Sequence, residues 1–278
     1  MDDLAGELHG DALDDLMMEC GSRSYDCHSY ILDSSDYGLP QGKRRLFIIG
    51  LLRPSRGFDV QDYSKFFEGA TSLLSAFRMS GPSLDEVLFE DNDECIKVDL
   101  SRRQLMKAKG WESHSISMHR QAWAQKGLRF QAMKASDNTL ASPWFDTLPL
   151  RERDVVAFHQ HVHRSRVKGC KEEKDKLAMM APLCAVDVSQ GIHRAPHSTI
   201  APDGRLVLCT VLPGSKIFLD IDSSIWPSCT REVRRLLHGQ EALNFIGWPV
   251  RAPDLAFYPS PSRMRSALTW LAMRLRPL

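Results

Sequence analysis

Hydrophobic and polar positions follow two different periods along the first eighty residues of the chain. Between residues 11 and 18, apolar side chains recur at helical spacing and predict a short amphipathic helix. Residues 25–32 alternate loosely and predict a strand, and the continuous apolar run at 46–52 predicts a second, buried strand. Because a loop rich in Asp, Ser, Gly and Pro separates these strands, we expect a hairpin-like unit at the edge of a sheet.

The rest of the chain mixes both kinds of pattern. Helical periodicity predicts further helices at residues 63–78, 151–163, 231–245 and 263–276, and in part of residues 99–125. From about residue 186 the pattern changes to that of short strands, at 186–188, 206–211 and 216–221. Pro-Asp-Gly and Pro-Gly sequences between these strands are typical of tight turns. The mixture therefore predicts an α/β fold.

Composition narrows the class of protein. A chain of 278 residues with 43% hydrophobic residues can bury a core in one large domain or two small ones. No apolar run approaches the length of a membrane span, and the acidic start is unlike a signal or transit peptide. The seven cysteines are scattered, odd in number and never spaced as Cys-x-x-Cys, which argues against a disulfide framework and a zinc site. We expect an intracellular protein that binds no metal.

The net charge of +1 hides a strong asymmetry. Residues 1–36 carry ten Asp or Glu and a single Arg, whereas residues 101–178 carry sixteen Lys or Arg against eight acids. The tail from residue 231 to 278 has eight Arg and three acids. Basic middle and end segments suit a phosphate backbone, although a single run such as 171–176 is more typical of a solvated helix face.

Residues 37–45 read Tyr-Gly-Leu-Pro-Gln-Gly-Lys-Arg-Arg and lead into the apolar run at 46–52. This segment resembles the Tyr-Gly-x-Pro-Gln-x-Arg-x-Arg motif of the DNA cytosine-5 methyltransferases, whose arginines reach the base being methylated. The resemblance implies catalytic roles for Gln41, Lys43 and Arg45. Arg45 keeps the planar fork of donors, whereas Lys43 offers a point charge, so Arg45 is the strongest candidate for contact with the base and the DNA. The alternative is a solvent-facing basic turn before a strand.

A second segment, residues 234–249, resembles the family's ninth motif, which organises its target-recognition region. The resemblance implies this organising role for Glu241, Gly247 and Pro249, and contact with DNA for Arg234 and Arg235. Taken alone, the segment is also compatible with an ordinary capped helix. It follows the first motif by some 190 residues, and a target-recognition region would occupy that interval.

Together these motifs imply the C-terminal portion of a Rossmann-like methyltransferase domain that depends on S-adenosyl-L-methionine. Residues 1–82 would be a catalytic-domain remnant with the last sheet strands. Residues 83–228 would form an irregular α+β target-recognition region, and residues 229–278 would return to the catalytic domain as helices. In this reading the chain begins just past the family's Glu-Asn motif.

Other parts of the family's machinery are not recognisable in the sequence: the cofactor loop, the Pro-Cys nucleophile, the Glu-Asn pair and the closing Gly-Asn pair. The segment Pro182-Leu183-Cys184 is not a Pro-Cys pair. We therefore expect that the chain alone neither holds S-adenosyl-L-methionine nor transfers methyl groups. Double-stranded DNA and a complementing methyltransferase segment are the expected partners, in the nucleus.

Two other functions stay open. The first is a non-catalytic module, derived from the same family, that binds DNA or a protein. The second is a truncated product without independent function, which exposed strand edges would make unstable. An RNA target is a further alternative, because one branch of the family acts on transfer RNA, although the long segment between the motifs suits the DNA branch better.

Overall fold

The structure is a computed structural model that describes residues 7–53, 60–108 and 135–247, with short gaps in the last range. The gaps fall at 168–169, 192–193, 213, 224–225 and 227–228, and a few isolated positions between 121 and 127 are also described. The chain divides into two compact units. Unit 1 comprises Met1–Gly38 and Lys43–Ser80, and unit 2 comprises Leu39–Gly42 and Gly81–Leu278. Both mix helices with small sheets, so the fold is α/β.

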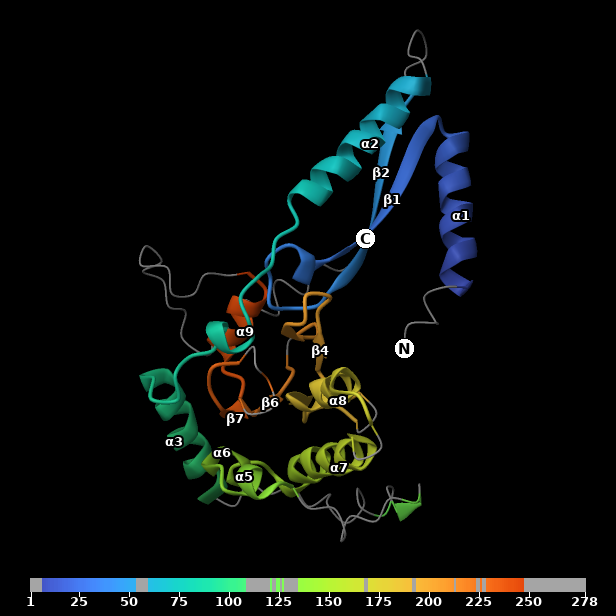
Figure 1. The fold of residues 1–278 in the computed structure, drawn as a ribbon. Helices are drawn as coiled ribbons and strands as arrows, with labels where there is room; N and C mark the ends of the chain where they lie inside the picture. Colours follow the sequence, from blue (N-terminus) through green and yellow to red (C-terminus); the bar gives the residue numbers. More distant parts are fainter. Residues whose placement is uncertain are drawn as a thin grey trace. The chain divides into compact units, whose positions relative to one another are not determined.

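Unit 1 is an antiparallel hairpin with a helix on each face (Figure 1). Strand β1 (Tyr25–Asp33) pairs with β2 (Arg44–Leu52) over nine residues, and these strands follow helix α1 (Glu7–Ser22) and precede helix α2 (Val60–Ala76). On one face, the ring of His28 stacks on Phe67 of α2 at 5.4 Å between centroids. On the other face, Cys27 interacts with Cys20 of α1. The predicted hairpin and the two predicted helices are confirmed.

The prediction that residues 46–52 form a buried strand is wrong in its burial. Leu46 and Phe47 are each 49% exposed, Leu52 is 60% exposed, and Ile31 beside them on β1 is 62% exposed. Within the described residues this sheet has only two strands, and each helix covers part of one face. The apolar run at residues 46–52 could be buried, but α1 and α2 cover only part of the hairpin.

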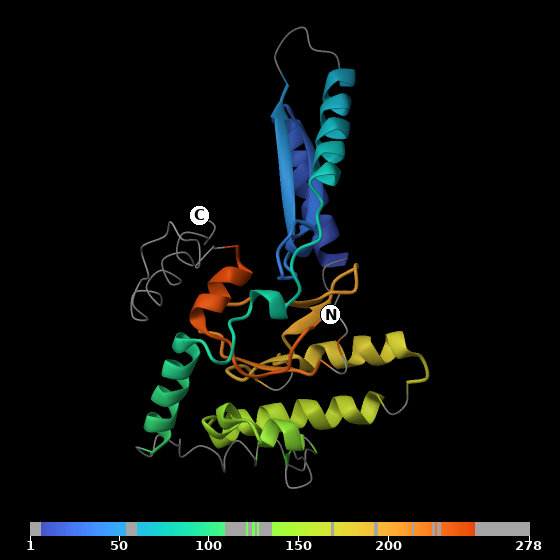
Figure 2. The ribbon, with the colours of Figure 1, turned by 60° about the vertical axis from the view of Figure 1, so that its left-hand side comes forward.

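Unit 2 is built around a three-stranded antiparallel sheet in the order β3-β6-β7. Its strands are β3 (Ala185–Asp187), β6 (Ile217–Ile221) and β7 (Val233–Leu236), and a separate ribbon pairs β4 (Ser198–Ile200) with β5 (Leu206–Leu208). The α-helices are α3 (Glu94–Ala108), α5 (Asp137–Leu140), α6 (Pro143–Asp146), α7 (Leu150–Val167), α8 (Glu173–Met180) and α9 (Gly239–Phe245). Short 3₁₀ turns lie at Asp85–Val87 and Ala181–Leu183. Figure 2 shows α7 and α8 running side by side.

The core of unit 2 lies on both faces of this sheet, because successive side chains of β6 point in opposite directions. Phe218 packs with Trp144 and Phe145 of α6 in one buried cluster. Leu219 packs with Leu206 of β5 and Phe245 of α9 in the other. The sheet is therefore buried on both sides, and the strand predicted for residues 216–221 is confirmed by β6.

The helix predicted for residues 231–245 is wrong in its first half. Residues Val233–Leu236 form β7, in which Arg235 lies opposite Leu219 of β6. The helix begins only at Gly239, where His238 and Glu241 form a capping box. The helix predicted for 151–163 is confirmed by α7, and that for 263–276 lies outside the described residues. None of the helices in the described ranges has the length and apolar character needed to cross a membrane.

Candidate functional site

The first motif begins with a bend whose two ends are joined by Asp33 at the end of β1. One carboxylate oxygen of Asp33 accepts hydrogen bonds from the backbone N–H of Ser35 at 3.0 Å and of Lys43 at 3.1 Å. The N–H of Ser34 donates to the carbonyl of Lys43 at 3.2 Å. Within the bend, Gly38 has φ +84°, and an added Cβ would lie 3.2 Å from Cγ of Met79. Asp33 therefore fixes the direction in which the chain enters β2.

The middle of the motif, residues 39–42, belongs to unit 2 and lies along β5. The N–H of Gly42 donates to the carbonyl of Leu208 at 2.7 Å, and the N–H of Leu208 donates to the carbonyl of Pro40 at 3.1 Å. Gln41 is buried at 2% exposure, and its Nε2 donates to the carbonyl of Cys209 at 3.3 Å. The side chain of Gln41 thus holds this stretch against the ribbon of unit 2.

The basic end of the motif belongs to unit 1. Lys43 is partly buried, and this burial together with the charge of Arg45 lowers the pKa of its amine. Arg45 is exposed near the start of β2, and its Nη1 donates to the carbonyl of Arg44 at 2.9 Å. Among the described residues, no carboxylate forms an ion pair with Lys43 or Arg45. These two cations are available to an external anion.

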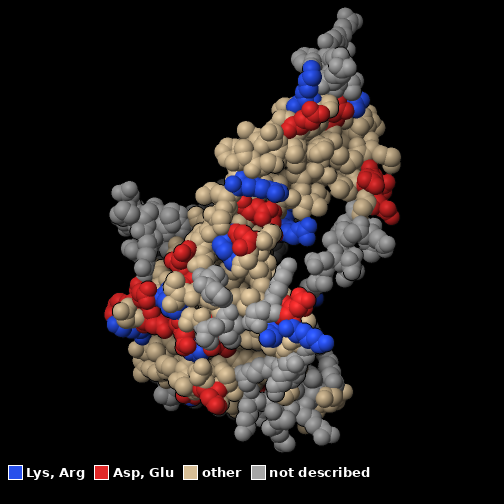
Figure 3. Space-filling view, viewed as in Figure 1, with Lys and Arg blue, Asp and Glu red and all other residues tan. Residues whose placement is uncertain are grey.

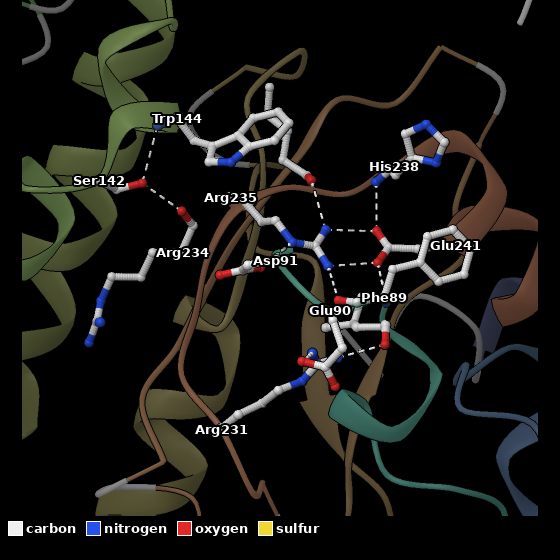
Figure 4. Close-up of polar contacts among 12 residues, drawn as sticks. Phe89, Glu90, Asp91, Ser142, Trp144, Arg231, Arg234, Arg235, His238 and Glu241 are labelled. Carbon is white, nitrogen blue, oxygen red and sulfur yellow. Dashed lines mark hydrogen bonds and ion pairs between the residues drawn. The ribbon is translucent and has the colours of Figure 1, made fainter. Parts of the chain in front are cut away.

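The second motif is centred on Arg235, whose side chain has no exposed surface (Figure 4). Its guanidinium forms a bidentate pair with Glu241, with N–O distances of 2.7 and 2.8 Å. It also donates to Asp91 at 2.8 Å and to the carbonyl of Phe89 at 2.8 Å. Burial alone would lower the pKa of Arg235, but the hydrogen bonds and charges of Glu241 and Asp91 raise it overall. Arg235 is a charged structural anchor.

Glu241 is the second member of this anchor and is also completely buried. Besides the two bonds from Arg235, its carboxylate accepts the N–H of Phe89 at 2.6 Å and the N–H of His238 at 2.8 Å. A single carboxylate thus joins the segment around residue 89, strand β7 and the start of α9. The role of Glu241 in organising target recognition stays a prediction.

Arg234 lies beside the anchor, on the opposite side of β7 (Figure 4). Its guanidinium is within ion-pair distance of Asp220 and Asp222, each at 3.4 Å, and of Glu232. Burial would lower the pKa of Arg234, but the hydrogen bond that it donates to Glu232 and the negative charges of these acids raise the pKa overall. With a side chain only 14% exposed, Arg234 is already surrounded by carboxylates.

Gly247 ends α9 with φ +87°, a conformation that favours glycine. A Cβ at this position would lie 3.2 Å from Cδ2 of Leu39, which belongs to the same unit. Pro249, the last residue predicted to organise this region, lies outside the described residues.

The structure therefore groups the predicted residues in two sets. The first set, in unit 2, makes its contacts within that unit and comprises Gln41, Arg234, Arg235, Glu241 and Gly247. The second set, Lys43 and Arg45 in unit 1, is available to an external anion. Sequence reasoning missed Asp33 and Asp91. Asp33 had a signal, since Asp followed by Ser at the end of a strand is typical of a capped turn, whereas nothing local marked Asp91.

Cys184 is 1% exposed, and burial raises the pKa of its thiol well above the ordinary value. A thiol kept protonated in this way is a poor nucleophile, so Cys184 acts as a packing residue.

The described residues do not fit a pocket for S-adenosyl-L-methionine. Nucleotide-type cofactors bind at the carboxyl ends of parallel strands joined by helical crossovers. Every pairing between the named strands here is antiparallel. We assign no described residue to that cofactor.

On the face seen in Figure 3, lysines and arginines of the described residues are interspersed with acids and form no continuous basic surface. This distribution fits the ion pairs above, in which unit 2 uses its arginines internally.

The sequence was compared with models of protein families and with curated proteins. A search of curated proteins finds no match. The family model for the C-5 cytosine-specific DNA methylase matches residues 2–251, which is most of the chain and includes both motifs. The chain belongs to the C-5 cytosine-specific DNA methylase family.

Proposed function

We propose that this protein is a C-terminal portion of a cytosine-5 DNA methylase that binds double-stranded DNA and contributes Arg45 to the target base. It does not transfer a methyl group alone. The observation that carries the proposal is the contrast between Arg45 and the two arginines of the second motif. Arg45 is exposed and has no carboxylate partner among the described residues, whereas Arg234 and Arg235 are both ion-paired within unit 2.

The fold is consistent with different roles for the two units. Unit 1, with a helix on each face of its hairpin, is compatible with the edge of a Rossmann-like sheet. Within residues 83–228, unit 2 has the short strands and helices of an irregular recognition region, and β7 and α9 continue it. A complementing methyltransferase segment would supply the cofactor pocket and the nucleophile. The protein would work in the nucleus, where its substrate lies.

A salt titration of duplex binding tests the DNA contact. Each phosphate that is neutralised releases counterions, so the logarithm of affinity falls linearly with the logarithm of salt concentration. Arg45→Ala should weaken binding by about 5- to 100-fold, as expected for loss of one bidentate base contact. Arg44→Ala removes the same charge from the adjacent residue and is the matched control, with a smaller loss. Equal losses from both variants, or no binding at low salt, would contradict the proposal.

A non-catalytic binding module is the second candidate function. The replacement of the motif's first arginine by Lys43 favours it, because an ammonium cannot make the bidentate contact. A complementation assay distinguishes the two candidates. The chain is mixed with an N-terminal methylase segment that carries a Pro-Cys pair, and methyl transfer from labelled cofactor to duplex DNA is measured. Transfer only in the mixture supports the methylase portion, and steep salt-dependent binding without transfer supports the module.

A further inference from the structure

Two cysteines of unit 1 meet where helix α1 packs on strand β1. Cys20 lies near the end of α1, and Cys27 lies in the first half of β1. Both are free thiols, and the side chain of Cys27 forms a hydrogen bond with the side chain of Cys20. Two thiols can form this bond only when their sulfur atoms are close and their side chains point toward each other. The same arrangement is a condition for a disulfide.

Both thiols are also accessible from solvent. Each residue is partly exposed, and Cys27 lies opposite Gly50 of β2, a position that has no side chain to cover the sulfur. A Cβ built at Gly50 would lie only 3.0 Å from Sγ of Cys27. Cys184 and Cys229 of unit 2 also interact, but they are only 1% and 4% exposed. A small oxidant can therefore reach the thiols of unit 1, whereas this pair in unit 2 is shielded.

We propose that Cys20 and Cys27 are a reversible oxidation site, at which a peroxide converts the two thiols into a disulfide that links α1 to β1. Disulfides of proteins in reducing compartments are usually transient, and many of them sense oxidants. Such sites combine an accessible thiol with a second thiol placed to resolve its oxidised form. This inference does not depend on the proposed contact with DNA.

The reaction takes two steps. The thiolate of Cys20 attacks one oxygen of hydrogen peroxide, the O–O bond breaks, and a sulfenic acid forms as hydroxide leaves and is protonated to water. The sulfur of Cys27 then attacks the sulfenic sulfur, the S–O bond breaks, and the oxygen leaves as a second water with the thiol proton. The two thiols lose two electrons, which the peroxide gains. A small thiol reverses the product by thiol–disulfide exchange.

The order of the two steps follows from the surroundings of Cys27. Burial and the neighbouring Cys20 raise the pKa of the Cys27 thiol, so less of it is thiolate at neutral pH. Because the thiolate is the nucleophile, Cys20 reacts with the peroxide first and Cys27 resolves the sulfenic acid.

Tryptic mapping after treatment with hydrogen peroxide tests the proposal on the full chain. Cleavage after Arg23 and Lys43 leaves Cys20 in peptide 1–23 and Cys27 in peptide 24–43, and neither peptide contains another cysteine. The chain is oxidised, its remaining thiols are alkylated, and the digest is analysed by mass spectrometry. We expect the two peptides to appear as one linked species that dithiothreitol separates. The intact chain should lose two free thiols and the mass of two hydrogens.

Three variants are the controls. Cys20→Ser and Cys27→Ser should each abolish the linked species. Cys170→Ser removes a partly exposed cysteine of unit 2 and should leave the yield of the linked species unchanged. Oxidation in concentrated urea separates native geometry from mere closeness in sequence. The seven cysteines of an unfolded chain can pair in many combinations, so the share of disulfides that join Cys20 to Cys27 should fall.

Three results would overturn the proposal. The first is a folded chain whose Cys20 or Cys27 is oxidised to the sulfinic acid without any linked species. The second is an equal share of this disulfide in the folded and the urea-unfolded chain. The third is a lower yield of the linked species in Cys170→Ser, which would show that another thiol takes part.

Discussion

The buried pair of Arg235 and Glu241 makes a quantitative prediction about the stability of unit 2. The change to make is Glu241→Gln, which keeps the shape of the side chain and removes its charge. The carboxylate accepts four hydrogen bonds: two from Arg235 and one each from the N–H groups of Phe89 and His238. An amide has one acceptor oxygen, so its NH₂ group must face two of these donors.

The size of the expected destabilisation follows from the hydrogen bonds and the charge that Glu241→Gln removes. A hydrogen bond to a charged group contributes about 1.5–3 kcal/mol, and Glu241→Gln removes one from Arg235 together with one from a backbone N–H. The guanidinium of Arg235 also keeps only Asp91 as a charged partner, and the side chain of Asp91 is 63% exposed. Removing one member of a buried ion pair typically costs about 3–5 kcal/mol. We expect the free energy of unfolding of unit 2 to fall by that amount.

Urea unfolding followed by tryptophan fluorescence measures this change, because Trp144 and Trp226 are buried in unit 2. Glu232→Gln is the matched control. Glu232 pairs with Arg234, but its side chain is 52% exposed, and an exposed pair contributes only about 0–1 kcal/mol. A loss below about 1 kcal/mol for Glu241→Gln, or equal losses for both variants, would refute the reasoning.

Three further predictions concern pH, α9 and the first motif. Burial lowers the pKa of His197 and His238 below their ordinary 6.5, so the folded state of unit 2 binds fewer protons than the unfolded state. The urea midpoint of unit 2 should therefore fall as the pH decreases from 6.5. His238→Asn should make the urea midpoint less dependent on pH. Gly247→Ala should lower the free energy of unfolding of unit 2 by about 1–2 kcal/mol, because Gly247 has a positive φ. Gly239→Ala, with no atom within 4 Å of the new Cβ, should leave the free energy of unfolding nearly unchanged. Urea unfolding measures both. Asp33→Ala should weaken duplex binding in a salt titration, because the bend before Lys43 and Arg45 loses two hydrogen bonds. Stronger binding, the result of removing a negative charge alone, would contradict this.

Local patterns predicted the elements whose structure depends on local chemistry. The hairpin and α2 follow from residue periodicity and turn residues, and α7 extends the predicted 151–163 helix at both ends. Strand β7 could not be predicted in this way, because Arg-Glu-Val-Arg-Arg-Leu-Leu is compatible with a helix. What makes it a strand is its pairing with β6 and the carboxylates that reach Arg235 from residues 91 and 241. Such partners are distant in sequence, and periodicity does not detect them.

Arg45 and Arg235 show why a motif alone does not assign a role to an arginine. Both match family motifs, but Arg45 is exposed near the start of a strand, whereas Arg235 is enclosed by two carboxylates and two backbone carbonyls. The guanidinium stays charged in either place, so the sequence contains no difference that separates a ligand contact from a structural anchor. Experiment can distinguish the two roles. Substitution of Arg45 should change the affinity for duplex DNA and leave the free energy of unfolding of unit 2 unchanged. Substitution of Glu241 should first destabilise unit 2 and reduce DNA binding only as far as the folded population falls.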